Sequence, residues 1–211
     1  MEVPLSIVLY HHPYSRAANV VWMLEEVGVP YSLRWVDIMA GEQKSPELLS
    51  LNPMGKLPVL TDGAAVVSES MAIALYLGDR HAPGRLAPLP DDPERGTYLR
   101  WSCFSPSVIE PAAAAHSSGG QFNPRAVGWG TYEDMLAATE AAIGAGPWLL
   151  GERFSMADTI FGGTLRYMLM FKMIEPRPAF TAYVQRLEAR PAFQRSAAKN
   201  AEVMAEHGLS R

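Results

Sequence analysis

A serine stands where an apolar segment near the N-terminus gives way to a helical pattern. The run at residues 5–10 (LSIVLY) is typical of a buried strand, which Pro13 would end. Ser15 follows at the start of the helical pattern, so its hydroxyl should lie beside the free N–H groups of a first helical turn. A hydrogen-bond donor and a positive helix end both favour the charged form of a thiol, so Ser15 could stabilise a thiolate. Simple N-capping by Ser15 is the alternative interpretation.

Other side chains of the same segment offer alternative chemistry. Tyr14 is a second hydroxyl donor near the strand end, whereas the strand pattern places Tyr10 in the core. His11 and His12 could suggest a metal ligand or a general base. Adjacent side chains on an extended segment face opposite ways, however, and no set of Asp, Glu or Cys converges with them. The sequence therefore predicts no metal site and leaves Tyr14 open as a rival to Ser15.

Two further positions combine turn chemistry with the start of an element. Pro58 interrupts the apolar run at 57–60, which indicates either a strand start after a loop or a cis peptide bond that turns an edge toward a ligand. Ser70 follows Glu69 where a strand should end and a helix begin, and free N–H groups at such a start can bind a carboxylate or phosphate. Helix capping by Ser70 is compatible with that role.

Cys103 is the only cysteine, which excludes an internal disulfide and a Cys-x-x-Cys pair and fits a reducing compartment such as the cytoplasm. It stands in an apolar helical stretch, so we expect it to be buried and unreactive. Residues 155–158 (SMAD) have the form of a capping box, with Ser155 at the N-cap and Asp158 at the N3 position in place of the usual Glu. We expect the loss of Asp158 to cost about 1 kcal/mol or more.

The elements that must position these residues follow from the hydrophobic periodicity. The expected segments are a strand at 5–10, a helix at 16–27, a strand at 31–37, a short helix ending near residue 52, a hairpin over 57–67 and a helix over 68–80. A right-handed crossover would make the first two strands parallel. This order, βαβ followed by ββα, is typical of a thioredoxin-like α/β domain, which we assign to residues 1–81.

A second domain is predicted beyond a proline-rich linker at residues 82–92. Strand signals then vanish, and helical patterns begin near residues 94, 125, 156 and 179. These patterns predict an all-α C-terminal helical bundle over residues 93–211.

The composition of the 211 residues limits the possible functions. A hydrophobic fraction of 48% and a charged fraction of 19% are typical of a globular protein. The net charge of −4 carries no basic cluster, so nucleic acid is not an expected partner. No apolar stretch approaches the roughly 20 residues of a membrane span, and the first residues lack the positive region of a signal peptide.

Taken together, four motifs resemble the cytosolic glutathione transferase family across essentially the whole chain. They are LYHHPYSRAANVVWMLEEVGVPY, LNPMGKLPVL, VVSESMAIALYL and WLLGERFSMADTIFGG. Their order and spacing carry the resemblance. It implies a thioredoxin-like glutathione-binding domain and an all-helical domain that contributes the electrophile pocket. It also implies a cytoplasmic homodimer with a role in detoxification.

The resemblance implies roles for several residues in holding glutathione as a co-substrate, with no metal. Pro58 would be the cis-proline of the family, and the backbone of Leu57 would pair with the cysteinyl part of glutathione. Glu69 and Ser70 would hold its γ-glutamyl end. The glycyl carboxylate would meet the charges of Lys44 and Lys56.

The activating residue implied by the resemblance is Ser15, as in serine-type classes. The loop HHPYS can shift by one position, which would put Tyr14 at the thiol instead. The loop contains no cysteine, so the mixed-disulfide chemistry of the cysteine-type classes is not expected.

The second substrate should lie against the first helix of the bundle. The residues expected there are Trp101, Phe104, Val108 and Ile109, with His11 or His12 at the mouth. Such an apolar and aromatic pocket suits hydrophobic electrophiles. The expected reaction is attack by the glutathione thiolate, helped by activation and proximity. The alternatives are a glutathione-dependent isomerase, dehalogenase or ether-cleaving enzyme on the same fold, or a non-catalytic binding protein.

Overall fold

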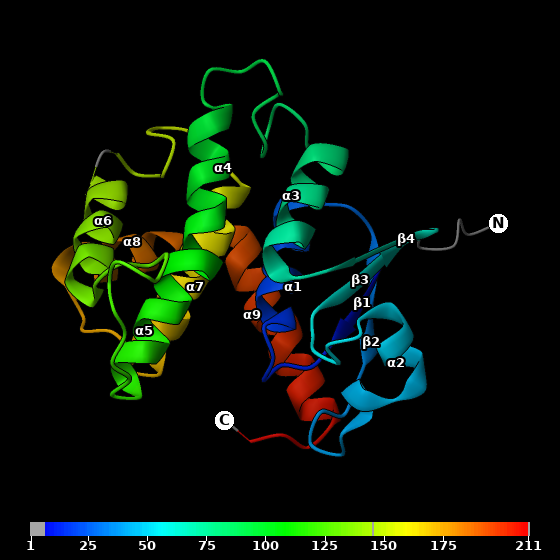
Figure 1. Ribbon diagram of the computed structural model, residues 1–211. Coiled ribbons are helices and arrows are strands. Elements are labelled where there is room, and N and C mark those ends of the chain that lie inside the picture. Colours follow the sequence, from blue (N-terminus) through cyan, green and yellow to red (C-terminus); the bar gives the residue numbers. More distant parts are fainter. Residues whose placement is uncertain (1–6, 145, 211) are drawn as a thin grey trace. The chain divides into compact units, whose positions relative to one another are not determined.

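The chain divides into two compact units in the computed structural model, which describes residues 7–144 and 146–210 (Figure 1). One unit comprises the chain up to His81 together with the segment from Pro191 onward, and the other comprises Ala82–Arg190. Residues 5 and 6 of the first expected strand lie outside the described residues.

A four-stranded mixed sheet, with strand order β2-β1-β3-β4, forms the centre of the first unit. β1 (Ile7–His11) runs parallel to β2 (Tyr31–Trp35) and antiparallel to β3 (Val59–Asp62). β3 in turn pairs antiparallel with β4 (Ala65–Ser68). The predicted βαβ-ββα order of a thioredoxin-like domain is confirmed.

Helices cover both faces of this sheet (Figure 1). α1 (Ala17–Val27) ends at Gly28, whose left-handed φ of 79° suits a residue without a side chain. α1 packs with α3 (Ser70–His81) on one face. α2 (Pro46–Leu51) follows a short turn of helix, η1 (Glu42–Lys44), and packs on the other face. The core under α2 consists of Tyr10, Val36, Leu48 and Val59, so Tyr10 is a core residue as expected.

The last helix, α9 (Pro191–Glu206), packs against α1. Trp22 and Phe193 meet edge to face with ring centroids 5.3 Å apart. The Arg195 guanidinium lies 2.7 Å from the Glu25 carboxylate. The compact helical unit therefore ends at Arg190, which differs from the expected extent of 93–211, because α9 buries its apolar side on the first unit.

The second unit is a bundle of helices, as predicted. They are α4 (Arg95–Phe104), α5 (Glu110–Ser117), α6 (Tyr132–Gly144), α7 (Met156–Met170) and α8 (Pro178–Glu188). A π-helical segment, η2 (Ser105–Ile109), joins α4 to α5 without a break. The fold class predicted from the sequence, an α/β domain plus an all-α domain, is thus confirmed.

Residues 82–92 pack on the second unit. Leu86 is buried, and its carbonyl accepts a hydrogen bond from the N–H of Met156 at 2.8 Å. The Arg153 guanidinium lies 2.8 Å from the Asp92 carboxylate. The proline-rich segment is therefore held to the helices of this unit at Leu86 and at Asp92.

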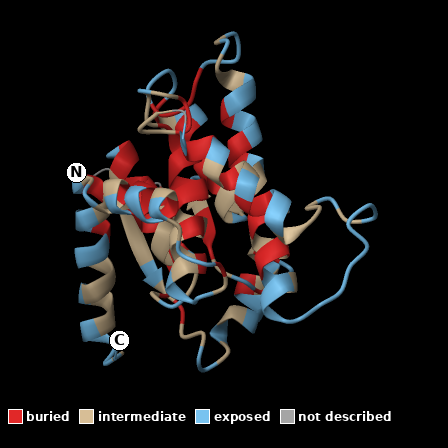
Figure 2. Ribbon diagram, turned by 90° about the vertical axis from the view of Figure 1, so that its left-hand side faces the viewer, coloured by how far each residue is buried: buried red, intermediate tan, exposed pale blue. Residues whose placement is uncertain are grey.

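The expected helix start near residue 125 is wrong, since α6 begins at Tyr132. Pro124, Gly128 and Gly130 interrupt any helix in between. Residues 117–126 are exposed (Figure 2). This segment therefore forms a long surface loop.

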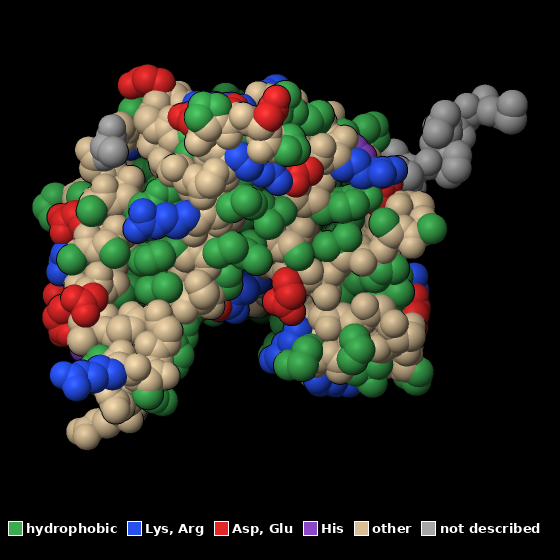
Figure 3. All heavy atoms as spheres, turned by 45° about the horizontal axis from the view of Figure 1, so that its top comes forward, with side chains coloured by type: hydrophobic (Ala, Val, Ile, Leu, Met, Phe, Trp, Pro, Cys, Tyr) green, Lys and Arg blue, Asp and Glu red, His purple; other side chains and the backbone are tan. Residues whose placement is uncertain are grey.

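No helix within the described residues is long and apolar enough to cross a membrane. Lys, Arg, Asp and Glu side chains are intermingled on the face drawn in Figure 3. The acidic side chains therefore do not form a single patch on that face.

Candidate active site

Three loops meet at one edge of the sheet of the first unit. Val59 pairs with Tyr10 on one side and with Ser68 on the other. The end of β1, the start of β3 and the end of β4 are therefore neighbours across the sheet. The loops that continue from them carry Ser15, Pro58 and Ser70, so three separated motifs converge on one edge.

Ser15 is held at the start of α1 by three hydrogen bonds. Its N–H donates to the carbonyl of His12 at 3.0 Å, and its hydroxyl donates to the same carbonyl at 2.8 Å. The hydroxyl also accepts from the N–H of Ala17 at 3.1 Å. The Ser15 hydroxyl therefore accepts from the first N–H of α1, but the N-cap position itself belongs to Arg16, so the capping interpretation is not confirmed. The side chain of Ser15 is half-buried beside the positive end of α1.

Tyr14 presents its ring to the surface, with 49% of the residue exposed. Its hydroxyl donates to the carbonyl of Ser210, near the C-terminus. Its N–H donates to Nδ1 of His12 at 3.0 Å. Each of the two rival hydroxyl groups therefore donates to a main-chain carbonyl.

His11 and His12 are both fully buried. Nε2 of His11 lies 2.7 Å from Oδ1 of Asn200 on α9, and the ring of His12 lies 4.7 Å from that of Trp35. His12 therefore differs from its expected place at a pocket mouth, because Trp35 and Tyr14 enclose it. Within residues 7–144 and 146–210, no group of three or more His, Cys, Asp or Glu could hold a metal ion.

Burial lowers the pKa of His11 from its ordinary value of 6.5 to about 4, with His12 adding to the lowering. The hydrogen bond to Asn200 acts in the opposite direction. The Nδ2 group of Asn200 donates to the carbonyls of Ala18 and Ser196, so its Oδ1 is the acceptor and Nε2 of His11 carries the proton. His11 is therefore neutral in the folded protein at neutral pH.

This neutral histidine predicts a loss of stability in acid. The unfolded chain takes up a proton on His11 at its ordinary pKa, whereas the folded protein does so only near pH 4. The free energy of unfolding should therefore fall as the pH drops from about 6.5 to about 4. In His11→Gln, whose Nε2 can still reach Asn200, the fall should be smaller. Urea unfolding of the wild type and of His11→Gln across this pH range measures the fall in the free energy of unfolding. An equal dependence on pH in the two proteins would contradict a neutral, buried His11.

The segment before β3 contains a cis peptide bond between Leu57 and Pro58. Asn52 organises this segment, because its Nδ2 donates to the carbonyl of Lys56 at 3.0 Å and its Oδ1 accepts from the N–H of Met54 at 3.1 Å. Asn52 is thus a positioning residue that the chemistry-bearing motifs do not include, although its place before Pro53 is a local signal for a turn.

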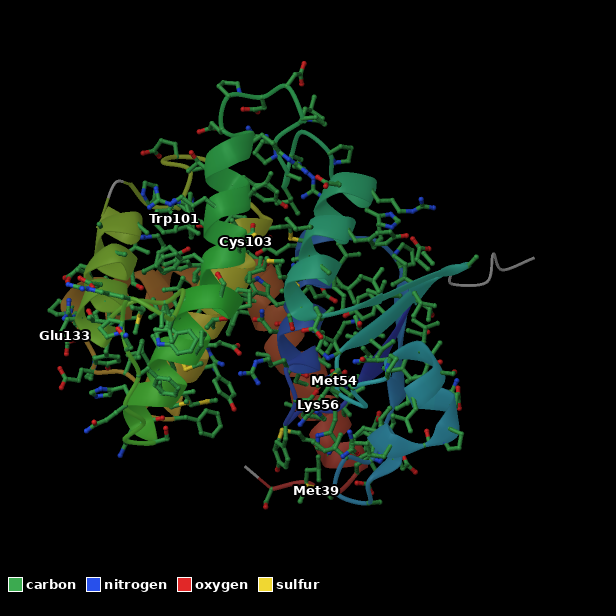
Figure 4. All side chains as sticks on the ribbon, viewed as in Figure 1. Met39, Met54, Lys56, Trp101, Cys103 and Glu133 are labelled. Atoms are coloured by element: carbon green, nitrogen blue, oxygen red, sulfur yellow. The ribbon has the colours of Figure 1, made fainter. Side chains whose placement is uncertain are left out.

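Lys44 and Lys56 both have exposed side chains. Nζ of Lys44 donates to the carbonyl of Met54 at 2.7 Å, so Lys44 lies against the segment that leads to β3. Figure 4 shows Lys56 and Met54 close together before that strand. Gly55 has a φ of 56°, and a Cβ there would lie 2.6 Å from Cδ of Lys44. Gly55 is thus needed for this close approach of the lysine.

The turn from β4 into α3 places Glu69 and Ser70. Glu69 has a left-handed φ of 68°, which is rare for a residue with a side chain and often marks a functional position. Its carbonyl accepts the N–H of Ile73 at 2.9 Å. Ser70 is the first residue of α3, so Glu69 rather than Ser70 precedes the helix at the cap position. The N–H groups of this first turn have no partner within the helix.

The residues expected to contact the second substrate come from one continuous helical segment in the second unit. Trp101 is buried, with its ring edge toward Phe104 at 5.2 Å and toward Phe161 at 5.9 Å. Phe104 and Val108 are half-buried, and Ile109 is fully buried.

Cys103 is exposed, so the expectation that it is buried is wrong. The buried positions of α4 are Tyr98, Trp101 and Ser102, which share one face of the helix. Cys103 lies outside this face, and Figure 4 shows Trp101 and Cys103 on different sides of α4.

Comparison with known proteins agrees with the fold. Residues 5–79 match the family model described as "Glutathione S-transferase, N-terminal domain", and residues 110–186 match "Glutathione S-transferase, C-terminal domain". Glutathione S-transferase 1 of Triticum aestivum is 30% identical over 214 residues, which cover 90% of this chain and 92% of the wheat protein.

Solved structures give the same result. The theta class glutathione S-transferase of Xanthomonas axonopodis pv. citri, solved with glutathione bound, is 30% identical. It superposes with a TM-score of 0.72 over 91% of this chain and 97% of its own. The glutathione transferase URE2P6 of Phanerochaete chrysosporium, in complex with oxidized glutathione, is 27% identical, with a TM-score of 0.78 over 96% and 100% of the two chains.

The fold is therefore that of a two-domain protein with a thioredoxin-like first domain. The chain belongs to the glutathione S-transferase family.

Proposed function

We propose that this protein is a glutathione transferase that binds glutathione at the edge of the sheet and directs its thiolate at a hydrophobic electrophile. The observation that carries the proposal is the register of β1, β3 and β4. It brings the loops of Ser15, Pro58 and Ser70 to one edge, in a chain of the glutathione S-transferase family.

Each part of glutathione meets matching chemistry in this proposal. The free N–H groups at the start of α3, together with Ser70, receive the γ-glutamyl carboxylate, and Glu69 receives its ammonium group. The backbone of Leu57, before Pro58, pairs with the cysteinyl part. Lys44 and Lys56 supply positive charge for the glycyl carboxylate.

Ser15 is the proposed activator of the thiol. Its hydroxyl can turn from the carbonyl of His12 to a thiolate without leaving the positive end of α1. The hydroxyl of Tyr14 is instead engaged by the carbonyl of Ser210. A hydrogen bond to the charged sulfur lowers the thiol pKa and so raises the fraction of thiolate at neutral pH.

The reaction is the conjugation of glutathione. The thiol proton leaves to solvent, and the thiolate sulfur forms a bond to an electrophilic carbon. A leaving group then departs with its electron pair or, in an addition, the adjoining atom takes up a proton. Trp101, Phe104 and Val108 offer apolar contacts for such an electrophile. The isomerase, dehalogenase and ether-cleaving alternatives share the binding step, and no feature of the described residues favours them.

A homodimer is part of the proposal. Met39 and Met54 are large apolar residues with 77% and 65% of their surface exposed, and exposed apolar side chains suit contacts between proteins. The molecular mass measured in solution tests the homodimer, since a dimer has twice the 23.1 kDa of one chain.

A cytoplasmic location, for which the single cysteine is the argument, stays a prediction.

The Ser70→Ala variant tests the binding site. We expect its affinity for glutathione to fall about tenfold, because one hydrogen bond to a carboxylate contributes about 1.5 kcal/mol. Calorimetric titration with glutathione measures the change. The matched control is Ser68→Ala, which removes a half-buried serine hydroxyl two residues earlier, in β4. Equal affinities of Ser70→Ala and the wild type would argue against this site.

A further inference from the structure

His12 makes three hydrogen bonds to the two candidate donors of the active site. Its Nδ1 accepts from the N–H of Tyr14 at 3.0 Å. Its carbonyl accepts from the N–H of Ser15 at 3.0 Å and from the hydroxyl of Ser15 at 2.8 Å. One residue therefore fixes the peptide of Tyr14 and the side chain of Ser15 together.

The ring of His12 is held in place by its surroundings. It is fully buried between the ring of Trp35, at 4.7 Å, and that of Tyr14, at 5.3 Å. Trp35 is covered in turn by His207, whose ring stacks on it at 3.6 Å and 6°. Because the imidazole cannot turn freely, its Nδ1 is a fixed acceptor for the loop.

The hydrogen bonds define the protonation state of His12. Nδ1 accepts the N–H of Tyr14, so a neutral ring carries its proton on Nε2. Burial lowers the pKa of His12, with Asp37 raising it and His207 lowering it. A doubly protonated ring would turn Nδ1 into a donor that faces the N–H of Tyr14. The observed loop therefore requires the neutral form.

We propose that His12 is a positioning residue for thiol activation, whose neutral imidazole fixes the loop from which Ser15 acts. This inference rests on the proposed function. In this role His12 does not contact the substrate, whereas the sequence predicted a place for it at the mouth of the substrate pocket. It acts through the peptide of Tyr14, which sets the distance and direction of the Ser15 hydroxyl.

Two substitutions of His12 test whether its hydrogen-bond acceptor is needed or whether any buried side chain is enough. His12→Leu fills part of the space and removes the acceptor. His12→Asn places its Oδ1 where Nδ1 of the imidazole lies, so it keeps an acceptor for the N–H of Tyr14. The matched control is Asn200→Leu, which removes the hydrogen bonds of Asn200 to the neighbouring His11 and to the carbonyls of Ala18 and Ser196. It removes none of the hydrogen bonds that His12 makes to Tyr14 and Ser15.

Two readouts follow the loop and the chemistry separately. The first is hydrogen exchange of the Tyr14 and Ser15 amides in the protein without glutathione. The second is the thiol pKa of bound glutathione, from the ultraviolet absorbance of the thiolate, with kcat and KM for glutathione. We expect His12→Leu to exchange these amides at least about tenfold faster and to lower kcat about tenfold, with a much smaller change in KM. His12→Asn and Asn200→Leu should stay close to the wild type in both readouts.

The inference is overturned if His12→Leu leaves both readouts unchanged, or if His12→Asn is impaired as strongly as His12→Leu. The second result would mean that the packing of the imidazole ring, rather than its Nδ1 acceptor, fixes the loop. If the wild type itself fails to bind glutathione, the proposed function fails, while amide exchange still decides whether His12 fixes the loop.

Discussion

Replacing Asp158 with alanine is expected to lower the free energy of unfolding by about 3–5 kcal/mol. The carboxylate is fully buried and accepts four hydrogen bonds. The donors are the N–H of Leu149 at 2.9 Å, the N–H and hydroxyl of Ser155 at 2.9 and 3.1 Å, and the hydroxyl of Tyr183 at 2.8 Å. Alanine would leave these donors buried without the acceptor.

The expected loss exceeds the roughly 1 kcal/mol of a helix cap alone. The predicted capping box of α7 is confirmed, but the same carboxylate also holds Leu149 in the preceding loop and Tyr183 on α8. Urea unfolding measures the difference. Glu152→Ala, which removes an exposed carboxylate six residues earlier, is the control and should change stability by less than about 0.5 kcal/mol. A loss below 1 kcal/mol for Asp158→Ala would show that these bonds contribute little.

The Ser15→Ala variant is expected to lose most of its thiol activation. A hydrogen bond to a charged group contributes about 1.5–3 kcal/mol, so the thiol pKa of bound glutathione should rise by about 1–2 units and kcat/KM should fall about 10- to 100-fold. The affinity for glutathione should change little, because the carboxylate contacts proposed for Ser70 and the lysines remain.

Tyr14→Phe decides between the two candidate donors. It removes only the hydroxyl that donates to Ser210, so activation should survive in it. The thiolate absorbance of bound glutathione and the steady-state kinetics are measured for both variants. If activation survives in Ser15→Ala and is lost in Tyr14→Phe, Tyr14 is the activator and the loop has shifted by one position relative to serine-type classes.

Elements of both units were predictable from local signals. Periodicity placed α1, and Gly28 ended it in a left-handed conformation that favours glycine. The serine and aspartate of the capping box, Ser155 and Asp158, are three positions apart, so a short stretch of sequence defines the start of α7. Pro58 alone was ambiguous, and its cis peptide bond was expected only from the resemblance.

The environment of the active-site loop could not be predicted in the same way, because distant segments create it. Asn200 meets His11 across 189 residues, and Tyr14 meets Ser210 across 196. No local pattern predicts that the helix after α8 will pack against α1 and place Asn200 beside His11. The burial of His12 therefore became visible only in the folded chain.

The position of Cys103 around the helix explains why its expected burial was wrong. The stretch around Cys103 is apolar, yet one residue turns a helix by about 100°, so Ser102 is buried and Cys103 is exposed. Composition alone does not tell these two neighbours apart.

The most direct test of the account is a titration of glutathione into the wild-type protein, followed by the ultraviolet absorbance of bound thiolate across pH. We predict saturable binding and a thiol pKa clearly below the ordinary cysteine value of about 8.5. Saturable binding without a lowered pKa would contradict thiol activation. The absence of glutathione binding would contradict the proposed function itself.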